Sequence, residues 1–306
     1  ISMDDPAHMQ RLARFVTGRT IGLVLGGGGA RGFAHIGVIR AIEEAGIPID
    51  TVGGVSMGAV ISAQYAMGWD LDDLVEKNRY AWIKTRPFSD YTLPVYSVLS
   101  GRRVNRISKQ AFGMQQIEDL PISFFCVSSN LTQARLQVHQ KGDLWKAVRA
   151  SGSLPGIFRP WIHESSLLVD GGIMNNLPCD IMKERNDGFL MSVDVSPVGR
   201  HMTIRSDSVV SPWETALKKI SPFDRGYGDP TLMDILIRST MLASAHKIDK
   251  TRNQADVYFC PPVQDFGLLE FKSIDAIVRT GYQYAQKKIQ AIEQAGDLDF
   301  LKLWEC

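Results

Sequence analysis

Residues 21–32 read IGLVLGGGGARG, and residues 49–58 read IDTVGGVSMG. Each stretch is a short apolar run that ends in glycines and leads into a segment whose apolar residues follow helical spacing. Two strand, loop and helix units in succession are typical of a parallel sheet that helices cover on both faces. The sequence therefore predicts an α/β fold in three layers, with a mostly parallel central sheet flanked by helices.

The rest of the chain continues this pattern without an internal repeat. We expect helices at 71–84, 101–112 and 273–295, a helix within 143–156 that Gly152 and Pro155 break, and strands within 122–130, 134–142, 165–170, 187–197 and 254–262. Residues 198–230 are polar and irregular. We therefore expect one domain over residues 20–306, preceded by an N-terminal extension at 1–19. The start Ile-Ser-Met is typical of a piece cut from a longer polypeptide.

Composition limits the partners and the compartment. Lysine and arginine number 34 against 33 acidic residues, so the net charge of +1 gives no reason to expect nucleic acid as a partner. The four cysteines have neither metal-site nor disulfide-framework spacing, which favours a reducing compartment and no metal. No segment has the pattern of a signal peptide or the length of a membrane span. We therefore expect a cytoplasmic protein, or a peripheral one on the cytoplasmic face of a membrane.

Residues 54–58 read GVSMG, a G-x-S-x-G between a predicted strand and a predicted helix. In a nucleophile elbow the serine occupies a strained turn, and Gly54 and Gly58 would let the strand and the helix approach each other. A helix that starts at Ser56 also directs N–H groups toward developing negative charge. Ser56 is therefore a candidate nucleophile, although the same pattern alone also occurs in ordinary glycine-rich turns.

The glycine run at 26–32 has two competing interpretations. Gly27, Gly29 and Gly32 match G-x-G-x-x-G, the phosphate cradle of dinucleotide-binding proteins, but the required acid would be Asp50, which precedes a strand instead of ending one. In the other interpretation, successive glycine N–H groups bind the oxyanion of a tetrahedral intermediate. No G-K-[ST] follows the run, so a Walker-type site is not predicted, and we expect no cofactor.

Asp170 ends the run SSLLVD and is followed by Gly171 and Gly172. An acid before two glycines is most often only a turn. A carboxylate there can also face the serine while backbone N–H groups hold its second oxygen. The histidines after Ser56 lack the context of a catalytic base; they are His139, His163, His201 and His246. Asp170 is therefore the candidate base, on a strand tip that we expect to converge with the tip carrying Ser56.

Taken together and in this order, GGGGARG, GVSMG and DGG resemble the motifs of the patatin-like phospholipases, in particular the neuropathy target esterase branch and its bacterial relatives. The resemblance covers most of residues 10–185 and is weaker after them. It implies a patatin-like α/β fold, a Ser/Asp dyad, no metal, and hydrolysis of acyl esters in lysophospholipids or phospholipids.

The resemblance also implies roles for residues. Ser56 takes the place of the nucleophile and Asp170 that of the base. The oxyanion loop would consist of Gly27, Gly28, Gly29 and Arg31, while Gly32 and Asn175 match flanking motif positions. Val55 is a departure, because that branch usually has threonine there. A β-branched residue is retained, so we expect the elbow to form.

Three classes of function stay open at this point: a lipid-acyl hydrolase, with acyl transfer or thioester cleavage as variants; a nucleotide-binding protein; and a non-catalytic scaffold. Aromatic residues in loop-like stretches fit either membrane contact or the core; they are Trp82, Phe88, Tyr91, Tyr96 and Trp213. A cluster of arginines could bind lipid phosphate, but a solvated helix face is the favoured interpretation; its members are Arg102, Arg103 and Arg106. The head group, the chain length and the oligomeric state are not predicted.

Overall fold

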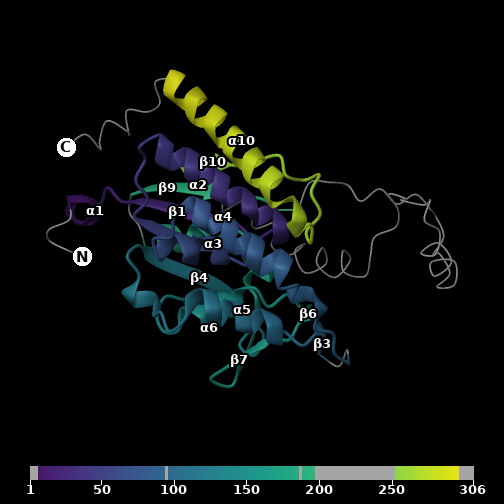
Figure 1. The fold of residues 1–306 in the computed structure, drawn as a ribbon. Helices are drawn as coiled ribbons and strands as arrows, with labels where there is room; N and C mark the ends of the chain where they lie inside the picture. The colour runs from purple at the N-terminus through teal and green to yellow at the C-terminus, as the bar shows by residue number, and fades with distance from the viewer. Residues whose placement is uncertain (1–5, 94–95, 186–187, 197–251, 296–306) are drawn as a thin grey trace, which may run out of the picture.

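A computed structural model describes residues 6–93, 96–185, 188–196 and 252–295. In these residues, eight strands form the central sheet in the order β10-β9-β1-β2-β4-β8-β7, with β5 paired to β4 (Figure 1). The strands are β1 (Ile21–Leu25), β2 (Thr51–Gly54), β4 (Ser123–Asn130), β5 (Arg135–His139), β7 (Trp161–His163), β8 (Ser166–Asp170), β9 (Phe189–Val193) and β10 (Val257–Phe259). A separate two-stranded sheet pairs β3 (Ser97–Leu99) with β6 (Gly156–Phe158).

The central sheet is mostly parallel, as predicted. Strands β10, β9, β1, β2 and β4 pair in parallel, whereas β5, β8 and β7 pair antiparallel. The main helices are α1 (Pro6–Val16), α2 (Ala34–Glu44), α3 (Met57–Ala66), α4 (Leu71–Arg79), α5 (Arg102–Phe112), α6 (Leu144–Ser151), α7 (Cys179–Lys183) and α10 (Ile274–Gln294). The continuous helix expected over 71–84 is α4 followed by a π-helical turn, η2 (Tyr80–Lys84). The irregular segment expected at 198–230 lies outside the described residues.

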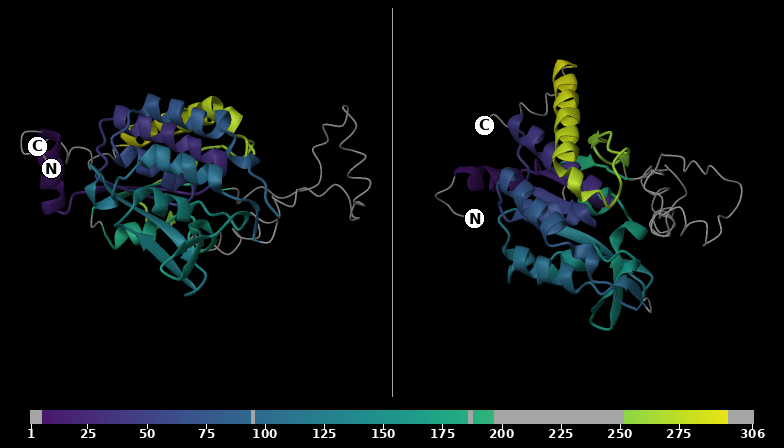
Figure 2. Two further views of the ribbon diagram at one scale, coloured as in Figure 1. Left: turned by 60° about the horizontal axis from the view of Figure 1, so that its bottom comes forward. Right: turned by 45° about the vertical axis from the view of Figure 1, so that its right-hand side comes forward.

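Side chains alternate between the two faces of the sheet, and both faces are covered. Leu23 and Leu25 of β1 join a large apolar cluster that includes residues of α2, α3, α6 and α10. Val24 points to the opposite face and joins a smaller cluster with α7. On the first face, α10 lies along α2, although the two helices are far apart in the sequence (Figure 2). The predicted three-layer α/β architecture is therefore confirmed.

Helix α1 is attached to the sheet through a buried carboxylate. Asp50, just before β2, accepts hydrogen bonds from Arg14 at 2.9 and 2.7 Å and from the N–H of Ile21 at 3.0 Å. Arg11 lies 3.5 Å from the same carboxylate. The division into residues 1–19 and 20–306 stays a prediction, but these contacts attach α1 to the end of the sheet where β1 and β2 begin.

Candidate active site

Ser56 stands at a sharp bend between β2 and α3. Its φ of 56° and ψ of −123° lie in a region that non-glycine residues rarely adopt. A Cβ on Gly58 would lie 2.1 Å from the carbonyl oxygen of Leu25, and one on Gly54 would lie 2.6 Å from the backbone of Gly58. The two glycines therefore permit the close approach of strand and helix, and the bend holds the half-buried Ser56 in a strained conformation.

The register of the sheet brings Asp170 level with Ser56. Gly54 of β2 pairs with Cys126 of β4, and two residues further along β4, Ser128 pairs with Asp170 of β8. Ser128 is two residues past Cys126, as Ser56 is two residues past Gly54, so Ser128 is level with Ser56. Asp170 pairs with Ser128 from the other side of β4 and is therefore level with Ser56 too. Strand β8 runs antiparallel to β4, so the chain arrives at Asp170 in the direction opposite to that in which it arrives at Ser56. The structure thus brings the two sequence candidates to one place.

Burial changes the acidity of Asp170. Its side chain is only 2% exposed, and burial raises its pKa to about 6. The Ser56 hydroxyl and the N–H of Gly172, which donates to Oδ1 at 2.8 Å, both lower this pKa but do not cancel the effect of burial. Oδ2 has no partner of standard hydrogen-bond geometry in the described residues. The Ser56 hydroxyl thus lowers the pKa of the carboxylate without forming a hydrogen bond of standard geometry to Oδ2. Catalytic hydrogen bonds often reach standard geometry only when substrate binds.

The end of α6 holds both loops. The N–H of Ser56 donates to Oγ of Ser151 at 2.9 Å, and the N–H of Asp170 donates to the carbonyl of Ser153 at 2.9 Å. Arg149 in turn donates to Oγ of Ser153 at 2.6 Å. Because one short turn binds the backbone of both residues, it limits their relative movement. The sequence reasoning missed these residues, although the small and hydroxyl side chains of RASGS were a signal.

The glycine loop lies against the same site. A Cβ on Gly27 would lie 3.1 Å from Cβ of Ser56, so the loop backbone is next to the serine. Within the described residues, the N–H groups of Gly28 and Gly29 donate to no acceptor, whereas that of Ala30 donates to the carbonyl of Leu268 at 2.8 Å. Two adjacent N–H groups beside a nucleophile are the donors that an oxyanion hole needs.

Asn176 connects the glycine loop with the Asp170 loop, and the sequence reasoning missed it. Its Nδ2 donates to the carbonyl of Gly27 at 3.0 Å and to Oγ of Ser196 at 2.9 Å. Its Oδ1 would lie 2.6 and 2.7 Å from a Cβ on Gly27 and on Gly172, respectively. The carboxamide therefore fills the space between the two loops. Asn175, the residue singled out from the sequence, instead donates to Asp180 at 2.7 Å.

The remaining sequence candidates support the loops from outside the cavity. The guanidinium of Arg31 donates to the carbonyls of Phe266 and Gln264 at 2.8 and 3.0 Å, so its side chain fastens a later segment onto the glycine loop. Gly32 faces the Met57 side chain, where a Cβ would lie 2.4 Å from Cγ. A Cβ on Gly171 would lie 2.3 Å from the carbonyl oxygen of Val127 on β4.

The described histidines do not line the cavity beside Ser56. His35 is fully buried, its Nε2 lies 2.8 Å from the carbonyl oxygen of Gly26, and burial lowers its pKa to about 4. His139 contacts Ser128 at 2.7 Å within the sheet, and His163 belongs to β7. His201 and His246 lie outside the described residues. Asp50, the acid of the dinucleotide interpretation, binds Arg14 at the other end of β2.

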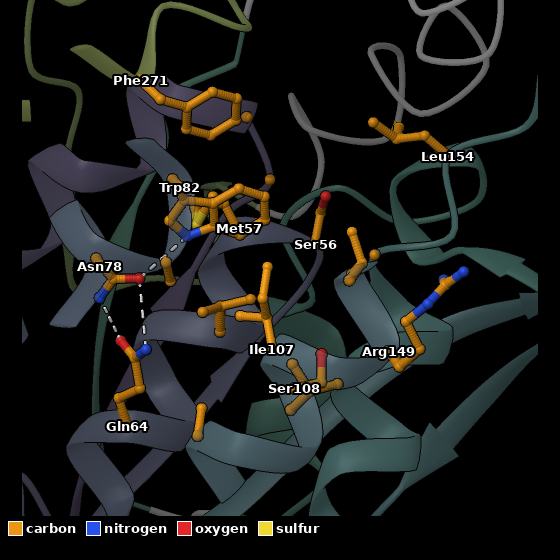
Figure 3. Close-up of a pocket in the computed structure, with 18 of the residues that line it drawn as sticks. Ser56, Met57, Gln64, Asn78, Trp82, Ile107, Ser108, Arg149, Leu154 and Phe271 are labelled. Atoms are coloured by element: carbon orange, nitrogen blue, oxygen red, sulfur yellow. Dashed lines mark hydrogen bonds between the residues drawn. The ribbon is translucent and has the colours of Figure 1, made fainter. Parts of the chain in front are cut away.

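A cavity of about 650 Å³ extends from Ser56 (Figure 3). Asp170 and glycines 27–29 line the end next to the serine, and side chains of α3, α4, η2, α5 and α6 form the other walls. The rings of Trp82 and Phe271 stack at 4.8 Å between centroids and form an apolar wall. A largely apolar cavity with a few convergent polar groups is typical of a site for a small apolar ligand.

Comparison with known proteins identifies the family of this chain. The family model described as patatin-like phospholipase matches residues 23–183, the span that carries the glycine loop, Ser56 and Asp170. The chain belongs to this family. The resemblance predicted from the three motifs is therefore confirmed. The roles assigned to single residues of this patatin-like phospholipase domain remain predictions.

Patatin-like phospholipases with similar sequences include long fungal proteins. The chain is 34% identical over 293 residues to lysophospholipase NTE1 of Meyerozyma guilliermondii, with 94% of this chain and 20% of that protein covered. It is 37% identical over 314 residues to lysophospholipase nte1 of Neurospora crassa, with 100% and 21% covered. The chain thus spans about a fifth of these relatives. Among solved structures, VipD from Legionella pneumophila aligns over 94% of this chain and 79% of that chain, with 14% identity and a TM-score of 0.40.

Neither a metal-binding cluster nor a membrane-spanning helix occurs in the described residues of this patatin-like phospholipase domain. In the part of the chain that the structure describes, no group of three or more histidine, cysteine or acidic side chains is arranged to hold a metal ion. In the same residues, no helix combines the length and the apolar character needed to cross a membrane.

Proposed function

We propose that this chain hydrolyses fatty-acyl esters of lysophospholipids or phospholipids, with Ser56 as nucleophile and Asp170 as general base. The observation that carries the proposal is a buried carboxylate of raised pKa level with a strained serine, at one end of an apolar cavity. Membership of the family and the names of the fungal relatives support a lipid ester as substrate. Since the chain spans only a fifth of those relatives, its own activity has to be measured.

In the first half-reaction, Asp170 accepts the proton of the Ser56 hydroxyl while Oγ forms a bond to the ester carbonyl carbon. The carbonyl oxygen becomes an oxyanion and accepts hydrogen bonds from the N–H groups of Gly28 and Gly29. Collapse of this intermediate breaks the bond to the lysolipid or glycerol alcohol, which takes the proton back from Asp170. A carboxylate with a pKa of about 6 is a stronger base than an ordinary aspartate and is still ionised at neutral pH.

In the second half-reaction, water replaces the alcohol. Asp170 accepts a proton from water as its oxygen attacks the acyl-enzyme carbonyl, and the same N–H groups bind the oxyanion again. The bond from the acyl carbon to Oγ of Ser56 then breaks, Ser56 regains its proton, and the fatty acid leaves. No histidine is needed in either step, because the same carboxylate serves as base and as acid.

Fatty-acid release from lysophosphatidylcholine tests the proposal. Ser56→Ala and Asp170→Asn should each lower kcat by at least about 1000-fold, because each removes a group that forms or transfers a bond. The matched control is Ser62→Ala, since Ser62 lies on the same helix but donates to the carbonyl of Gly53 at 3.2 Å. A fluorophosphonate probe should label Ser56 in the wild type. Full activity of Asp170→Asn, or a label on another serine, would contradict the proposed dyad.

Membrane contact is a secondary proposal. Of the aromatic residues singled out from the sequence, Trp82 and Phe88 line the cavity, whereas Tyr91 and Tyr96 are 74% and 71% exposed on the following loop. Trp213 lies outside the described residues. The exposed tyrosines support transient contact with a lipid surface, since tyrosine is favoured at such interfaces. Cosedimentation with anionic vesicles should fall when both tyrosines are replaced by serine; unchanged binding would remove this proposal.

A further inference from the structure

Helix α5 has two faces of different character. Its positions 104, 107, 108 and 111 line the cavity that extends from Ser56. With about 3.6 residues per turn, positions 102, 105, 106 and 109 lie on the opposite face. These positions and Gln110 line a second, open hollow of about 380 Å³ on the surface. Gln110 lines both spaces, so the second hollow adjoins the first.

The second hollow is basic, and its charge is not balanced within the helix. Three of its five lining side chains are Arg102, Arg106 and Lys109, and α5 contains no acidic residue. Arg102 and Arg106 are four positions apart, and like charges at this spacing repel each other. Arg102 also stands in the first turn, where the helix dipole disfavours a cation. This arrangement destabilises α5 unless an anion binds there.

Neighbouring elements do not balance this charge either. In the part of the chain that the structure describes, the three basic side chains of the hollow form no ion pair. Asp143, which precedes the adjoining α6, pairs with Lys146 instead. Nζ of Lys109 lies 4.7 Å from the centroid of the Trp145 ring, which holds this amine beside the hollow. The hollow therefore offers its cations to an anion from outside the described residues.

An exposed apolar stretch lies beside the start of α5. Tyr91, Leu93 and Tyr96 are 74%, 81% and 71% exposed. Oδ2 of Asp90 accepts a hydrogen bond from the N–H of Arg103 at 3.2 Å, so this stretch is attached to the first turn of α5. Basic side chains beside exposed apolar ones match an anionic membrane surface, where aromatic rings lie among the head groups and cations meet phosphates. A soluble polyanion would leave the apolar side chains in water.

We propose that the hollow formed by Arg102, Arg106 and Lys109 binds the phosphates of an anionic lipid surface and thereby docks the domain on a membrane. This inference rests on the proposed action on membrane lipids and gives the membrane contact a defined, charge-dependent site. The opposite face of α5 lines the cavity, so docking brings the lipid surface to within about one helix diameter, roughly 10 Å, of the cavity wall. Loss of one basic side chain should weaken binding about fivefold, and loss of all three roughly 100-fold.

A solvated helix face is the competing explanation, and it is the interpretation that the sequence alone favours. Basic side chains that only face water attract an anionic surface through the net charge of the domain. Removing three of them would then weaken vesicle binding by a similar factor wherever they lie. A docking site instead makes the three residues of the hollow contribute far more than three other exposed cations. The two explanations therefore differ in a ratio that can be measured.

The experiment measures cosedimentation with vesicles of phosphatidylcholine and phosphatidylglycerol in equal amounts. All proteins carry Ser56→Ala, so that binding is measured without consumption of lipid. The test variant is Arg102→Gln/Arg106→Gln/Lys109→Gln, which should bind roughly 100-fold more weakly than its parent. It should also be at least as stable in urea, because the substitutions relieve repulsion within α5. Lower stability would show that the three cations have partners within the protein and would contradict the inference.

The matched control removes the same charge from another surface. It is Lys272→Gln/Arg279→Gln/Lys287→Gln, at exposed positions on α10 and just before it. Helices α10 and α5 lie on opposite sides of α3 and α4 (Figure 1). The control should bind the vesicles less than about threefold more weakly than its parent. An equal loss of binding in the control and in the test variant would overturn the inference.

The parent protein with an intact hollow provides a test that does not depend on these variants. Its binding should require phosphatidylglycerol and should fall at least tenfold when salt rises from about 0.1 to about 1 M, since the Debye length shortens from roughly 10 to 3 Å. Equal binding to pure phosphatidylcholine would overturn the inference. Displacement by inorganic phosphate at constant ionic strength would overturn it too, because the hollow would then be a site for free phosphate. Vesicle binding without any ester hydrolysis by the wild type would instead contradict only the proposed function.

Discussion

Replacing Asp170 by asparagine should abolish activity and also stabilise the fold at neutral pH. The carboxylate of Asp170 is 2% exposed, and Oδ2 has no partner of standard geometry among the described residues. Folding therefore transfers a charge from water into a site that solvates it poorly. Asparagine has nearly the same shape, and its Oδ1 can still accept from the N–H of Gly172. The substitution removes the cost of burying the charge and keeps this hydrogen bond.

The size of the effect follows from the pKa of Asp170, which burial raises from 3.8 to about 6. Because the folded-state pKa lies above the unfolded-state value, the native protein binds its proton more tightly, and it loses stability as the pH rises from about 4 to about 6. Each pH unit in this interval costs about 1.4 kcal/mol, so the full cost above pH 6 is about 3 kcal/mol. Asp170→Asn should gain this amount at pH 8 but only about 1 kcal/mol at pH 4.5.

Urea unfolding of the wild type and of Asp170→Asn at pH 8 and pH 4.5 measures the difference. At pH 8 the variant should also melt roughly 6 °C higher. Asp119→Asn is the matched control, because Asp119 is exposed and the same change there should alter stability little at either pH. If Asp170→Asn is no more stable than the wild type at pH 8, or if its advantage is equal at both pH values, the carboxylate is not a poorly solvated buried charge.

Three further predictions concern the same loops and the attachment of α1. The kcat/KM for a soluble ester should fall about tenfold per pH unit below about pH 6, the pKa of Asp170, and an acid limb nearer pH 4 would exclude Asp170 as the base. Asn176→Ala, which removes the bond to the carbonyl of Gly27, should lower kcat about 100-fold with little change in KM; a change in KM alone would show that the residue only binds substrate. Arg14→Ala should lower the free energy of unfolding by about 3 kcal/mol, because it weakens the pairing of the buried Asp50; urea unfolding with an unchanged midpoint would contradict this.

The elements that the sequence predicts are those with a strong local pattern. Strands β1 and β2 follow from apolar runs that end in glycines, and α10 follows from a long amphipathic period. Strands β3, β6 and β7 were not predicted, whereas β10, which is equally short, was predicted from the apolar run within 254–262. The antiparallel direction of β8 was not predicted either, because direction depends on which strands pair.

The candidate site could be predicted only in part, for a similar reason. Ser56 and Asp170 were found because each ends a predicted strand in a motif that can be recognised locally. Ser151, Ser153 and Asn176 act through hydrogen bonds to residues that are far away in the sequence. Nothing in their own neighbourhood specifies those partners. The side chain of Arg31 likewise binds carbonyls at 264 and 266, which the motif that contains it does not indicate.

The stability cost of the proposed site is concentrated where strands end. Ser56 holds a backbone conformation that costs of order 1–3 kcal/mol, and the buried charge of Asp170 costs about as much again. Neither residue lies in the middle of a strand, where both faces carry apolar side chains such as Leu23 and Val24 that stabilise the fold. The N–H of Ser56 donates to the hydroxyl of Ser151 at the end of α6, and the N–H of Asp170 donates to the carbonyl of Ser153 just after it, so a shift of this turn would move both residues. Substitutions in this turn should therefore reduce activity more than stability, whereas substitutions in the strand interiors should do the reverse.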